Sequence, residues 1–146
     1  MQSLSIPIDS IDAFVFDFDG VLTNNLVHLD QDGREHVSCS RADGIAFDLL
    51  RKIQKPAYIL STEKNSVVTA RANKLKILAI QGIANKVEAI KQLAEQEGFL
   101  LSNILYVGND LNDYRIMRLC GYTACPADSH EKIKEIANII LKTEGG

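Results

Sequence analysis

Two aspartates, Asp17 and Asp19, stand two residues apart at the end of a short apolar run. They open the string Asp-Phe-Asp-Gly-Val-Leu-Thr, which ends at Thr23, and Gly20 within it indicates that the chain turns there. Carboxylates at the edge of an apolar core are costly unless a metal ion or a charged partner meets them. An isolated Asp-x-Asp is as often a solvated turn, but the complete string is much less common by chance. The segment therefore indicates a site for a cation or another charged partner.

A second acidic cluster, Gly108-Asn109-Asp110-Leu111-Asn112-Asp113, also follows an apolar run. A helix N-cap at Asn109 or Asp110 explains this cluster as well as a functional role does. If the two runs are parallel strands, their carboxyl ends meet at one sheet edge, and both clusters converge on one hard cation. Carboxylate and carbonyl oxygens without His or Cys suit Mg²⁺. We therefore expect a magnesium site at this edge.

Two further residues carry groups suited to an anion such as phosphate. Ser61 follows the apolar run 57–60 and precedes a helical segment, where a hydroxyl and free backbone N–H groups hold a phosphate oxygen. Taken alone, Ser61 is better explained as an ordinary helix cap. Lys86 opens the segment 86–97, where a cation opposes the helix dipole, so a negative partner is expected. A solvated surface lysine is the alternative.

The elements that must position these residues alternate along the chain. Short apolar runs predict strands at 11–17, 57–60, 77–80, 104–107 and 122–124, and helical periodicity predicts helices at 43–53, 66–75, 86–97, 111–119 and 131–141. Asp32-Gly33 between two alternating segments predicts a β-hairpin at about 24–40. The pattern indicates an α/β fold with a mostly parallel sheet and helices on both faces, built as a single domain over residues 1–146.

Composition excludes several classes of function. The formal net charge of -3 gives no basic excess for nucleic-acid binding. The longest apolar stretches are strand-sized, so we expect no membrane span. The N-terminus lacks the basic start and apolar run of a secretion signal, and Cys39, Cys120 and Cys125 form no metal-binding spacing. We expect a cytoplasmic protein with free thiols.

The order and spacing of these segments resemble the four motifs of the haloacid dehalogenase superfamily, over nearly the whole chain. The resemblance implies a Rossmann-like fold and an Mg²⁺-dependent phosphatase that works through an aspartyl-phosphate. Asp17 would be the nucleophile, and Asp19 the general acid and base. Ser61 would bind the transferring phosphoryl group, and Lys86 would neutralise Asp17 and the phosphate. The implied metal ligands are Asp17, Asp19, Asn109 and Asp110, with Gly20 and Asp113 in support.

A hairpin alone follows Thr23, which leaves no room for a cap domain. The chain thus resembles a cap-less branch that includes phosphatases of Kdo 8-phosphate and of 2-keto-3-deoxy-nononic acid 9-phosphate. The branch also includes the domain associated with N-acylneuraminate cytidylyltransferases. Membership implies a homotetramer in which the hairpins associate and neighbouring subunits complete each active site.

The resemblance also favours a substrate, a phosphorylated 2-keto-3-deoxy sugar acid. Kdo 8-phosphate phosphatases usually carry Thr-Gly-Arg where this chain has Ser61-Thr62-Glu63. The nononic-acid enzymes carry Glu and Lys at the positions of Glu63 and Lys74, so the nine-carbon acid is favoured and Kdo 8-phosphate comes next. The implied substrate-binding residues are Thr62, Glu63, Arg71, Lys74 and Asp43. A solvated helix face explains Glu63, Arg71 and Lys74 about as well, and Asp43 fits a helix cap.

Two departures keep a second interpretation open. Relatives often carry Asp where Asn109 stands, which leaves the metal to an amide oxygen assisted by Asp110 or Asp113. The family usually continues past Gly145-Gly146 into a tail that reaches a neighbouring site. The alternative is a non-catalytic oligomerisation or regulatory domain that serves a cytidylyltransferase. A phosphomutase lacks support without a cap, and Asp19 favours turnover over a receiver-type phosphorylation switch.

Overall fold

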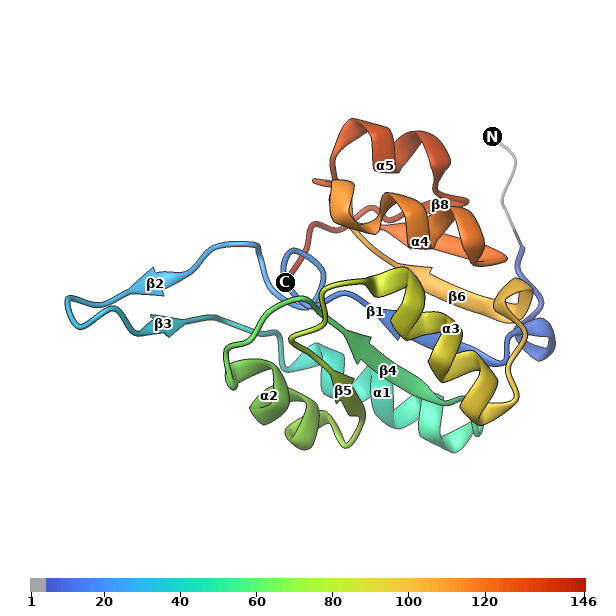
Figure 1. Cartoon of the computed structure of the whole chain (residues 1–146), viewed down its shortest axis with the longest axis horizontal. Helices are drawn as coiled ribbons and strands as arrows, with labels where there is room; N and C mark the ends of the chain where they lie inside the picture. The colour runs from blue at the N-terminus through green and yellow to red at the C-terminus, as the bar shows by residue number, and fades with distance from the viewer. Residues whose placement is uncertain (1–4) are drawn as a thin grey trace.

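A six-stranded parallel sheet forms the centre of the molecule in the computed structural model, which describes residues 5–146. Its strand order is β5-β4-β1-β6-β7-β8, and β2 and β3 form a separate hairpin (Figure 1). The strands are β1 (Ala13–Phe16), β2 (His28–Leu29), β3 (Glu35–His36), β4 (Ala57–Leu60), β5 (Leu78–Ile80), β6 (Ile104–Val107), β7 (Tyr122–Cys125) and β8 (Ile139–Ile140). The helices are α1 (Ala42–Lys52), α2 (Val67–Leu75), α3 (Lys86–Glu97), α4 (Tyr114–Leu119) and α5 (Glu131–Ile136). Short 3-10 turns lie at η1 (Ile8–Ser10), η2 (Leu101–Asn103) and η3 (Leu111–Asp113). The predicted α/β class and parallel sheet are confirmed.

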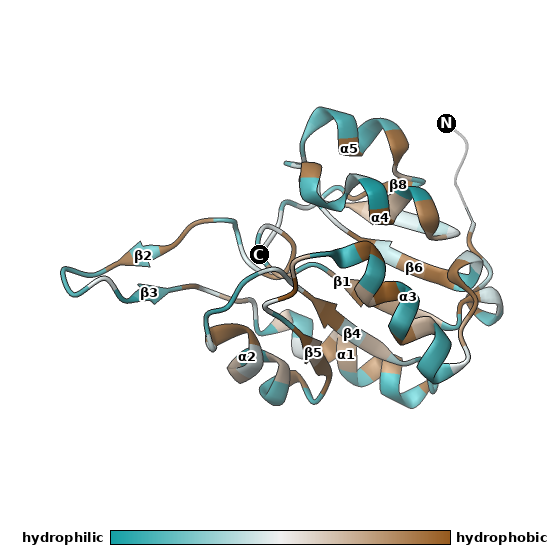
Figure 2. Ribbon diagram, in the orientation of Figure 1, coloured by the Kyte–Doolittle hydropathy of each residue, from teal (hydrophilic) through white to brown (hydrophobic). Residues whose placement is uncertain are grey.

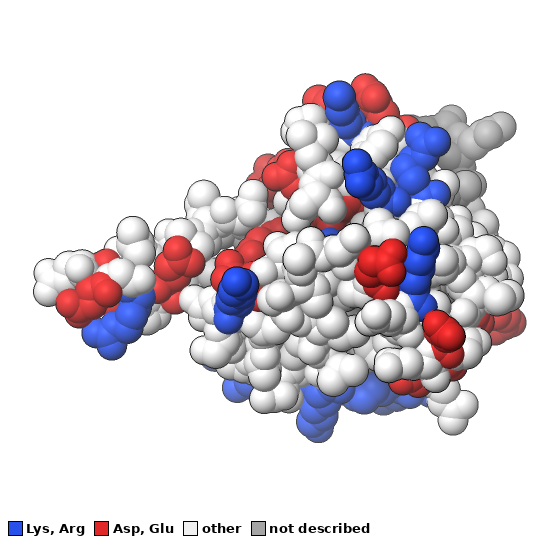
Figure 3. All heavy atoms as spheres, viewed as in Figure 1, with Lys and Arg blue, Asp and Glu red and all other residues white. Residues whose placement is uncertain are grey.

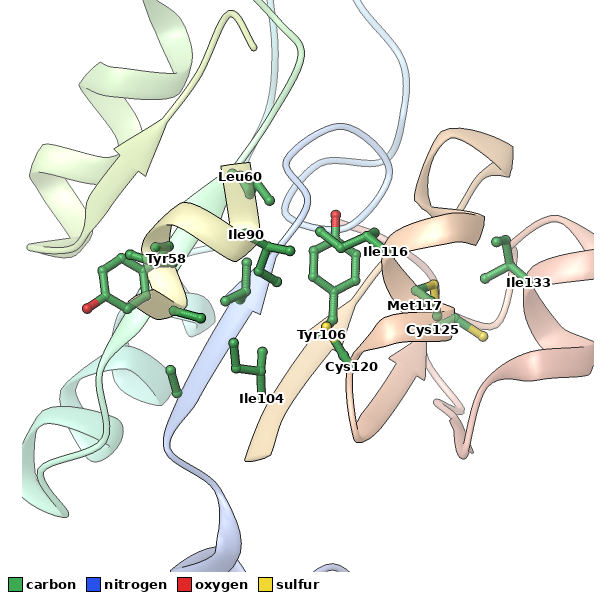
Figure 4. Close-up of a cluster of buried hydrophobic side chains, with 14 residues drawn as sticks. Tyr58, Leu60, Ile90, Ile104, Tyr106, Ile116, Met117, Cys120, Cys125 and Ile133 are labelled. Carbon is green, nitrogen blue, oxygen red and sulfur yellow. The ribbon is translucent and has the colours of Figure 1, made fainter. Parts of the chain in front are cut away.

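Helices cover both faces of the sheet because successive strand residues point to opposite sides. On one face, Ala13 and Val15 of β1 pack with residues of α3, α4 and α5, and Figure 4 shows this cluster around Tyr106 and Ile116. On the other face, Ile59 packs with residues of α1 and α2. Brown strands between helices with teal outer surfaces show the same division in Figure 2. The core thus fixes β1, β4 and β6 side by side, with their carboxyl ends at one edge.

The hairpin β2–β3 projects from the body as a flap (Figure 1). Its turn is held by Asp30, whose Oδ1 accepts hydrogen bonds from the N–H groups of Asp32 and Arg34, both at 2.9 Å. Gly33 has φ +83°, a left-handed conformation that favours glycine. Asp32-Gly33 therefore forms the turn that the sequence predicts.

The helix predicted at 131–141 is wrong in its second half. α5 ends at Ile136, and Ile139–Ile140 forms β8, which pairs with β7. Asn138 stabilises this break: its Oδ1 accepts from the N–H of Thr123 at 2.9 Å, and its own N–H donates to Thr123 Oγ1 at 3.0 Å. Apolar residues in this segment fit a helical period, but β7 offers an open sheet edge that β-branched isoleucines fill better.

No helix among residues 5–146 is long and apolar enough to cross a membrane. Cys39, Cys120 and Cys125 are free thiols, and Cys120 and Cys125 lie in the core.

Candidate active site

Three loops meet where β1, β4 and β6 end, and they enclose a small polar hollow. Phe16, the last residue of β1, pairs with Ile59 of β4 and with Val107 of β6. The residues that follow these strands therefore come together from distant parts of the chain. The hollow has a volume of about 80 Å³ and is lined by Asp17, Asp19, Asn25, Ser61, Thr62, Asn109, Asp110 and Asn112.

Asp17 is buried at the floor of this hollow. Its Oδ1 accepts a hydrogen bond from the N–H of Phe18 at 2.8 Å and lies 2.9 Å from Nζ of Lys86. Burial and the nearby charge of Asp113 raise the pKa of Asp17 from 3.8 to about 7, although Lys86 acts to lower it. The site thus holds a carboxylate whose negative charge is incompletely compensated by the protein.

Lys86 is the first residue of α3, where a cation opposes the helix dipole. Its ammonium group is buried, 2.9 Å from Asp17 and 2.8 Å from Asp113, so the expectation of a negative partner is confirmed twice. Burial acts to lower the pKa of Lys86, but the two carboxylates outweigh it and raise the pKa. Asn85 caps the helix instead, because its Oδ1 accepts from the N–H groups of Val87 and Glu88. Lys86 therefore stays charged between two acids.

Asp113 is fully buried, and its carboxylate accepts several hydrogen bonds. Its Oδ1 accepts from Lys86 Nζ at 2.8 Å and from the hydroxyl of Tyr106 at 2.6 Å, and its Oδ2 accepts from the N–H of Asn109 at 3.0 Å. Burial acts to raise the pKa of Asp113, but Lys86 and these hydrogen bonds lower it below its usual range. Asp113 is therefore an anion that fixes Lys86 and the Asn109 loop.

Tyr106 has no role in the sequence-based expectations, yet its buried hydroxyl joins this network. It accepts a hydrogen bond from Lys86 Nζ at 3.1 Å while it donates to Asp113. Burial, together with Asp113, raises the pKa of Tyr106 well above its usual value, so the hydroxyl keeps its proton. A phenol within the otherwise aliphatic strand β6 was the available signal.

The turn after Asp19 explains the glycine and threonine of the first motif. Gly20 has φ +81°, and a Cβ at this position would lie 1.9 Å from the Asn109 amide nitrogen. Thr23 is buried, and its Oγ1 accepts from the N–H groups of Gly20 at 3.1 Å and Asn25 at 3.2 Å. Glycine thus admits the Asn109 side chain, and threonine closes the turn.

The oxygens around Asp17 fit a hard cation. One end of the Asn109 amide lies 3.0 Å from the carbonyl oxygen of Asp19 and 3.2 Å from Oδ2 of Asp17. As nitrogen, that end donates hydrogen bonds to both; as oxygen, it completes a group of three converging oxygens. Adjacent ligands of an octahedral Mg²⁺ with bonds of about 2.1 Å stand about 3 Å apart. Since no three His, Cys, Asp or Glu side chains gather at such a site within residues 5–146, a metal here needs the carbonyl and amide oxygens.

Asp19 is half-exposed to the hollow, and its environment favours the protonated form. Burial raises the pKa of Asp19, the acids Glu63 and Glu35 raise it further, and Lys86 opposes them. A raised pKa suits a carboxyl group that transfers protons.

Ser61 is buried beside the hollow but does not cap α2, which begins six residues later at Val67. Its Oγ accepts a hydrogen bond from the N–H of Glu63 at 3.1 Å, which leaves the hydroxyl hydrogen free to donate.

Thr62 and the exposed Asp110 also line the hollow, and Asp110 accepts a hydrogen bond from the N–H of Leu111 at 2.7 Å. Asn25 and Asn112 line it as well, and sequence reasoning gave them no role.

Four predicted substrate-binding residues lie outside the lining of the hollow. The Glu63 carboxylate accepts hydrogen bonds from the backbone N–H groups of Lys64 and Asn65. Arg71 donates from Nη2 to the carbonyl of Ser40 at 2.7 Å, below the flap. Arg71 Nε and Asp43 Oδ2 are buried without a hydrogen-bond partner in the described part of the chain. Lys74 is exposed in the last turn of α2.

The chain end packs against the first motif (Figure 1). The N–H of Gly146 donates to the carbonyl of Val21 at 3.2 Å, and the N–H of Gly145 donates to Asp128 Oδ1 at 3.0 Å. A Cβ on Gly145 would lie 2.1 Å from the carbonyl oxygen of Gly20. The glycine pair therefore permits a close approach to the turn that carries Asp19.

The chain is similar to several known proteins. Residues 48–145 match the family model described as haloacid dehalogenase-like hydrolase. The 3-deoxy-D-manno-octulosonate (Kdo) 8-phosphate phosphatase of Escherichia coli (strain K12) is 28% identical over 139 residues, which cover 94% of this chain and 74% of that one.

Solved structures show the same fold. A protein from Streptomyces avermitilis MA-4680, assigned to the HAD family of hydrolases, is 43% identical with a TM-score of 0.94, over 97% of this chain and 82% of that one. The Kdo 8-phosphate phosphatase of Moraxella catarrhalis, crystallised with a magnesium ion, a phosphate ion and Kdo, is 26% identical with a TM-score of 0.90, over 95% of this chain and 80% of that one.

Proposed function

Because the chain belongs to the haloacid dehalogenase-like hydrolases and is a phosphoric monoester hydrolase of their cap-less branch, we propose that it removes phosphate from a 2-keto-3-deoxy sugar acid. The observation that carries this proposal is the pairing of Asp17 with Lys86, next to the carbonyl oxygen of Asp19 and the amide of Asn109. A purely structural domain has no need of a buried carboxylate whose pKa is raised to about 7.

Asp17 would act first, as the nucleophile. One oxygen of its carboxylate attacks phosphorus, the bond from phosphorus to the sugar oxygen breaks, and an acyl phosphate forms on Asp17. Lys86, the hydroxyl of Ser61 and the backbone around Thr62 would bind the phosphoryl oxygens and offset their charge. Asp17, the Asp19 carbonyl and Asn109, with Asp110 close by, would hold an Mg²⁺ ion, which would supply further positive charge against the repulsion between two anions.

Asp19 would act in both halves of the reaction. Its raised pKa lets it protonate the departing sugar oxygen. The resulting carboxylate then takes a proton from water, whose oxygen attacks phosphorus and releases phosphate from Asp17. Asp19 ends protonated, as it began.

Two substrates of this class compete. Glu63 and Lys74 favour a nine-carbon 2-keto-3-deoxy acid, by the resemblance of the sequence. The relatives at 28% identity are phosphatases of an eight-carbon acid, Kdo 8-phosphate. We propose that the nine-carbon ester is the better substrate. Glu63, Arg71, Lys74 and Asp43 would shape the flap side of the site, on the approach to the hollow.

A homotetramer is part of the proposal. Leu26 and Leu29 on the flap are 66% and 67% exposed, and Ile45 on α1 is 75% exposed. Exposed apolar side chains on a projecting hairpin suit burial against another copy of the chain. Light scattering of the protein would report a mass near four protomers.

Phosphate release in Mg²⁺ tests the function. The panel comprises a 2-keto-3-deoxy-nononic acid 9-phosphate, Kdo 8-phosphate and a hexose 6-phosphate without a carboxylate. We expect kcat/KM to be higher for the two sugar-acid phosphates than for the hexose 6-phosphate, and highest for the nine-carbon ester. A folded protein that releases phosphate from none of them contradicts the proposal.

A further inference from the structure

Asn25 lines the hollow, but it has no task in the reaction proposed above. It lies between Thr23, the last residue of the first motif, and strand β2 of the flap. The side chain of its neighbour Asn24 is already engaged, because Asn24 Oδ1 accepts a hydrogen bond from the N–H of Leu26 at 3.1 Å. Asn25 itself bonds only through its backbone N–H within residues 5–146. Its carboxamide is therefore free to bind a ligand.

The backbone of Asn25 adopts a left-handed conformation, with φ +68°. Gln54 and Lys76 are the other non-glycine residues of the described chain with a positive φ, and they follow the ends of α1 and α2. A left-handed residue is a common way to end a helix. Asn25 ends no helix, and glycine would adopt this conformation with less strain than asparagine. A polar side chain in such a conformation at the hollow indicates that the side chain itself is used.

One hydroxyl group links Asn25 to the turn that carries Asp19. Thr23 Oγ1 accepts hydrogen bonds from the N–H of Gly20 at 3.1 Å and from the N–H of Asn25 at 3.2 Å, and Gly20 directly follows Asp19. Thr23 is fully buried, so this link is shielded from water. Ser61, in contrast, reaches the hollow from the loop after β4. Asn25 is thus fixed on the side of the hollow where Asp19 would protonate the departing sugar oxygen.

Both candidate substrates carry a hydroxyl group close to that oxygen. A 2-keto-3-deoxy acid of eight or nine carbons that is phosphorylated on its last carbon has a hydroxyl on the carbon before it. A hexose 6-phosphate in its ring form has the ring oxygen there instead. A carboxamide offers an NH₂ donor and a carbonyl acceptor, and a hydroxyl group can bond to either. The chemistry of Asn25 therefore matches this hydroxyl.

The charges around Asp19 also favour a neutral ligand group at this point. Glu63 and Glu35 both act on the Asp19 carboxyl group, and Figure 3 shows acidic side chains along the flap. A hydroxyl group carries no charge, so these acids do not repel it. The carboxylate at the far end of the substrate would be left to the cations of α2, Arg71 and Lys74.

We propose that the Asn25 carboxamide binds the hydroxyl group next to the phosphate-bearing carbon of the substrate. This inference rests on the proposed phosphatase function, and it adds a residue that selects esters with a hydroxyl at that position. The hydroxyl is unchanged in the reaction, so its bond to Asn25 is equally strong in the substrate and in the transition state. Loss of the bond raises KM and leaves kcat nearly unchanged.

The test compares Asn25→Gly with Gln54→Gly. Glycine accepts the positive φ at both positions, so each variant should fold and melt near the native temperature. Gln54 is exposed and precedes β4, whereas Ser61 and the hollow follow that strand. Each protein is assayed with whichever of Kdo 8-phosphate and 2-keto-3-deoxy-nononic acid 9-phosphate the native protein hydrolyses better, and with p-nitrophenyl phosphate, which has no such hydroxyl.

We expect Asn25→Gly to raise KM for the sugar-acid phosphate about 5-fold, the effect of one neutral hydrogen bond, and to leave KM for p-nitrophenyl phosphate unchanged. Gln54→Gly should match the native protein on both. An analogue of the sugar-acid phosphate without the adjacent hydroxyl completes the comparison. The native protein should have a KM about 5-fold higher for the analogue than for the ester itself, and Asn25→Gly should have equal KM values for the two.

An unchanged KM of Asn25→Gly for the sugar-acid phosphate overturns the inference and leaves the phosphatase function standing. An equal rise of KM for p-nitrophenyl phosphate assigns Asn25 to the phosphoryl end and also overturns it. A native protein that is inactive on both sugar-acid phosphates instead contradicts the function itself.

Discussion

Asp17 and Asp113 are both buried, and they lie 2.9 Å and 2.8 Å from the same ammonium group of Lys86, yet their surroundings act in opposite directions. Asp113 also accepts from Tyr106 and from the backbone of Asn109, and its pKa is lowered. Asp17 has Lys86 and one local N–H on Oδ1, while its Oδ2 faces the Asn109 amide, and its pKa is raised to about 7.

The difference distinguishes a supporting acid from the acid that we propose as the nucleophile. Hydrogen-bond donors contact both oxygens of Asp113, so its carboxylate stays ionised and positions Lys86. Asp17 keeps one oxygen toward the hollow, where the protein leaves its charge for a cation or a phosphoryl group to stabilise. Lys86 thus lies between Asp113, whose ionised form is stabilised, and Asp17, whose ionised form is destabilised.

The largest effect we predict is on catalysis by Asp17→Asn. The amide cannot attack phosphorus, so phosphate release should fall by at least about 10⁴-fold. The same change removes a buried charge, so the metal-free protein should be at least as stable as the native protein at pH 8. Phosphate release and thermal melting measure the two effects. A variant that keeps a tenth of the activity contradicts the assignment of Asp17.

Asp113→Asn should have the opposite effect on stability. It breaks a buried ion pair and replaces one of the two acceptor oxygens with an NH₂ group, so the donors of Lys86, Tyr106 and Asn109 cannot all keep an acceptor. The free energy of unfolding should therefore fall by about 3–5 kcal/mol. Urea denaturation measures it. Asp110→Asn is the matched control, because Asp110 is exposed and accepts one local hydrogen bond, and it should cost under about 1 kcal/mol. Equal losses in the two variants would refute the role given to Asp113.

Magnesium should stabilise the protein more at pH 8 than at pH 5. The pKa of Asp17 is raised in the folded state, so its contribution to stability is present below 3.8 and is lost as pH rises through about 7. A cation beside the ionised carboxylate offsets that loss, and protons compete with it at pH 5. Melting temperatures with and without Mg²⁺ measure this effect. Asp17→Asn should abolish it, and a shift that is independent of pH would argue against metal binding by Asp17.

Tyr106→Phe should give the smallest change. It removes one donor to Asp113 and one acceptor for Lys86 but keeps the packed ring, so we expect a loss of about 1–2 kcal/mol in the free energy of unfolding. Denaturation of Tyr58→Phe provides the control, because Tyr58 lies in the same core cluster but outside the Lys86 network. If both variants are equally stable, the Tyr106 hydroxyl contributes nothing to the network.

Much of the fold and of the candidate site could be predicted because short-range signals carry them. Apolar runs predicted the central strands, and the first motif pointed to Asp17 and Asp19, which line one hollow in the structure. The end of α5 could not be found this way, since pairing with β7 and the contacts of Asn138 override a local helical period.

The support around the site was harder to predict because it depends on contacts between distant elements. From the sequence alone, Tyr106 is interpreted as one more core residue of a strand. The structure shows that its hydroxyl donates a hydrogen bond to Asp113. Spacing along the sequence carries no record of that juxtaposition.

Trapping the phosphorylated carboxylate tests the account most directly. The native protein is mixed with a sugar-acid phosphate and Mg²⁺, quenched during turnover and treated with borohydride, which reduces an acyl phosphate to an alcohol. Peptide mass spectrometry then locates the reduced residue. The account predicts reduction at Asp17 that depends on substrate. Reduction at another carboxylate, or at none while phosphate is released, would contradict it.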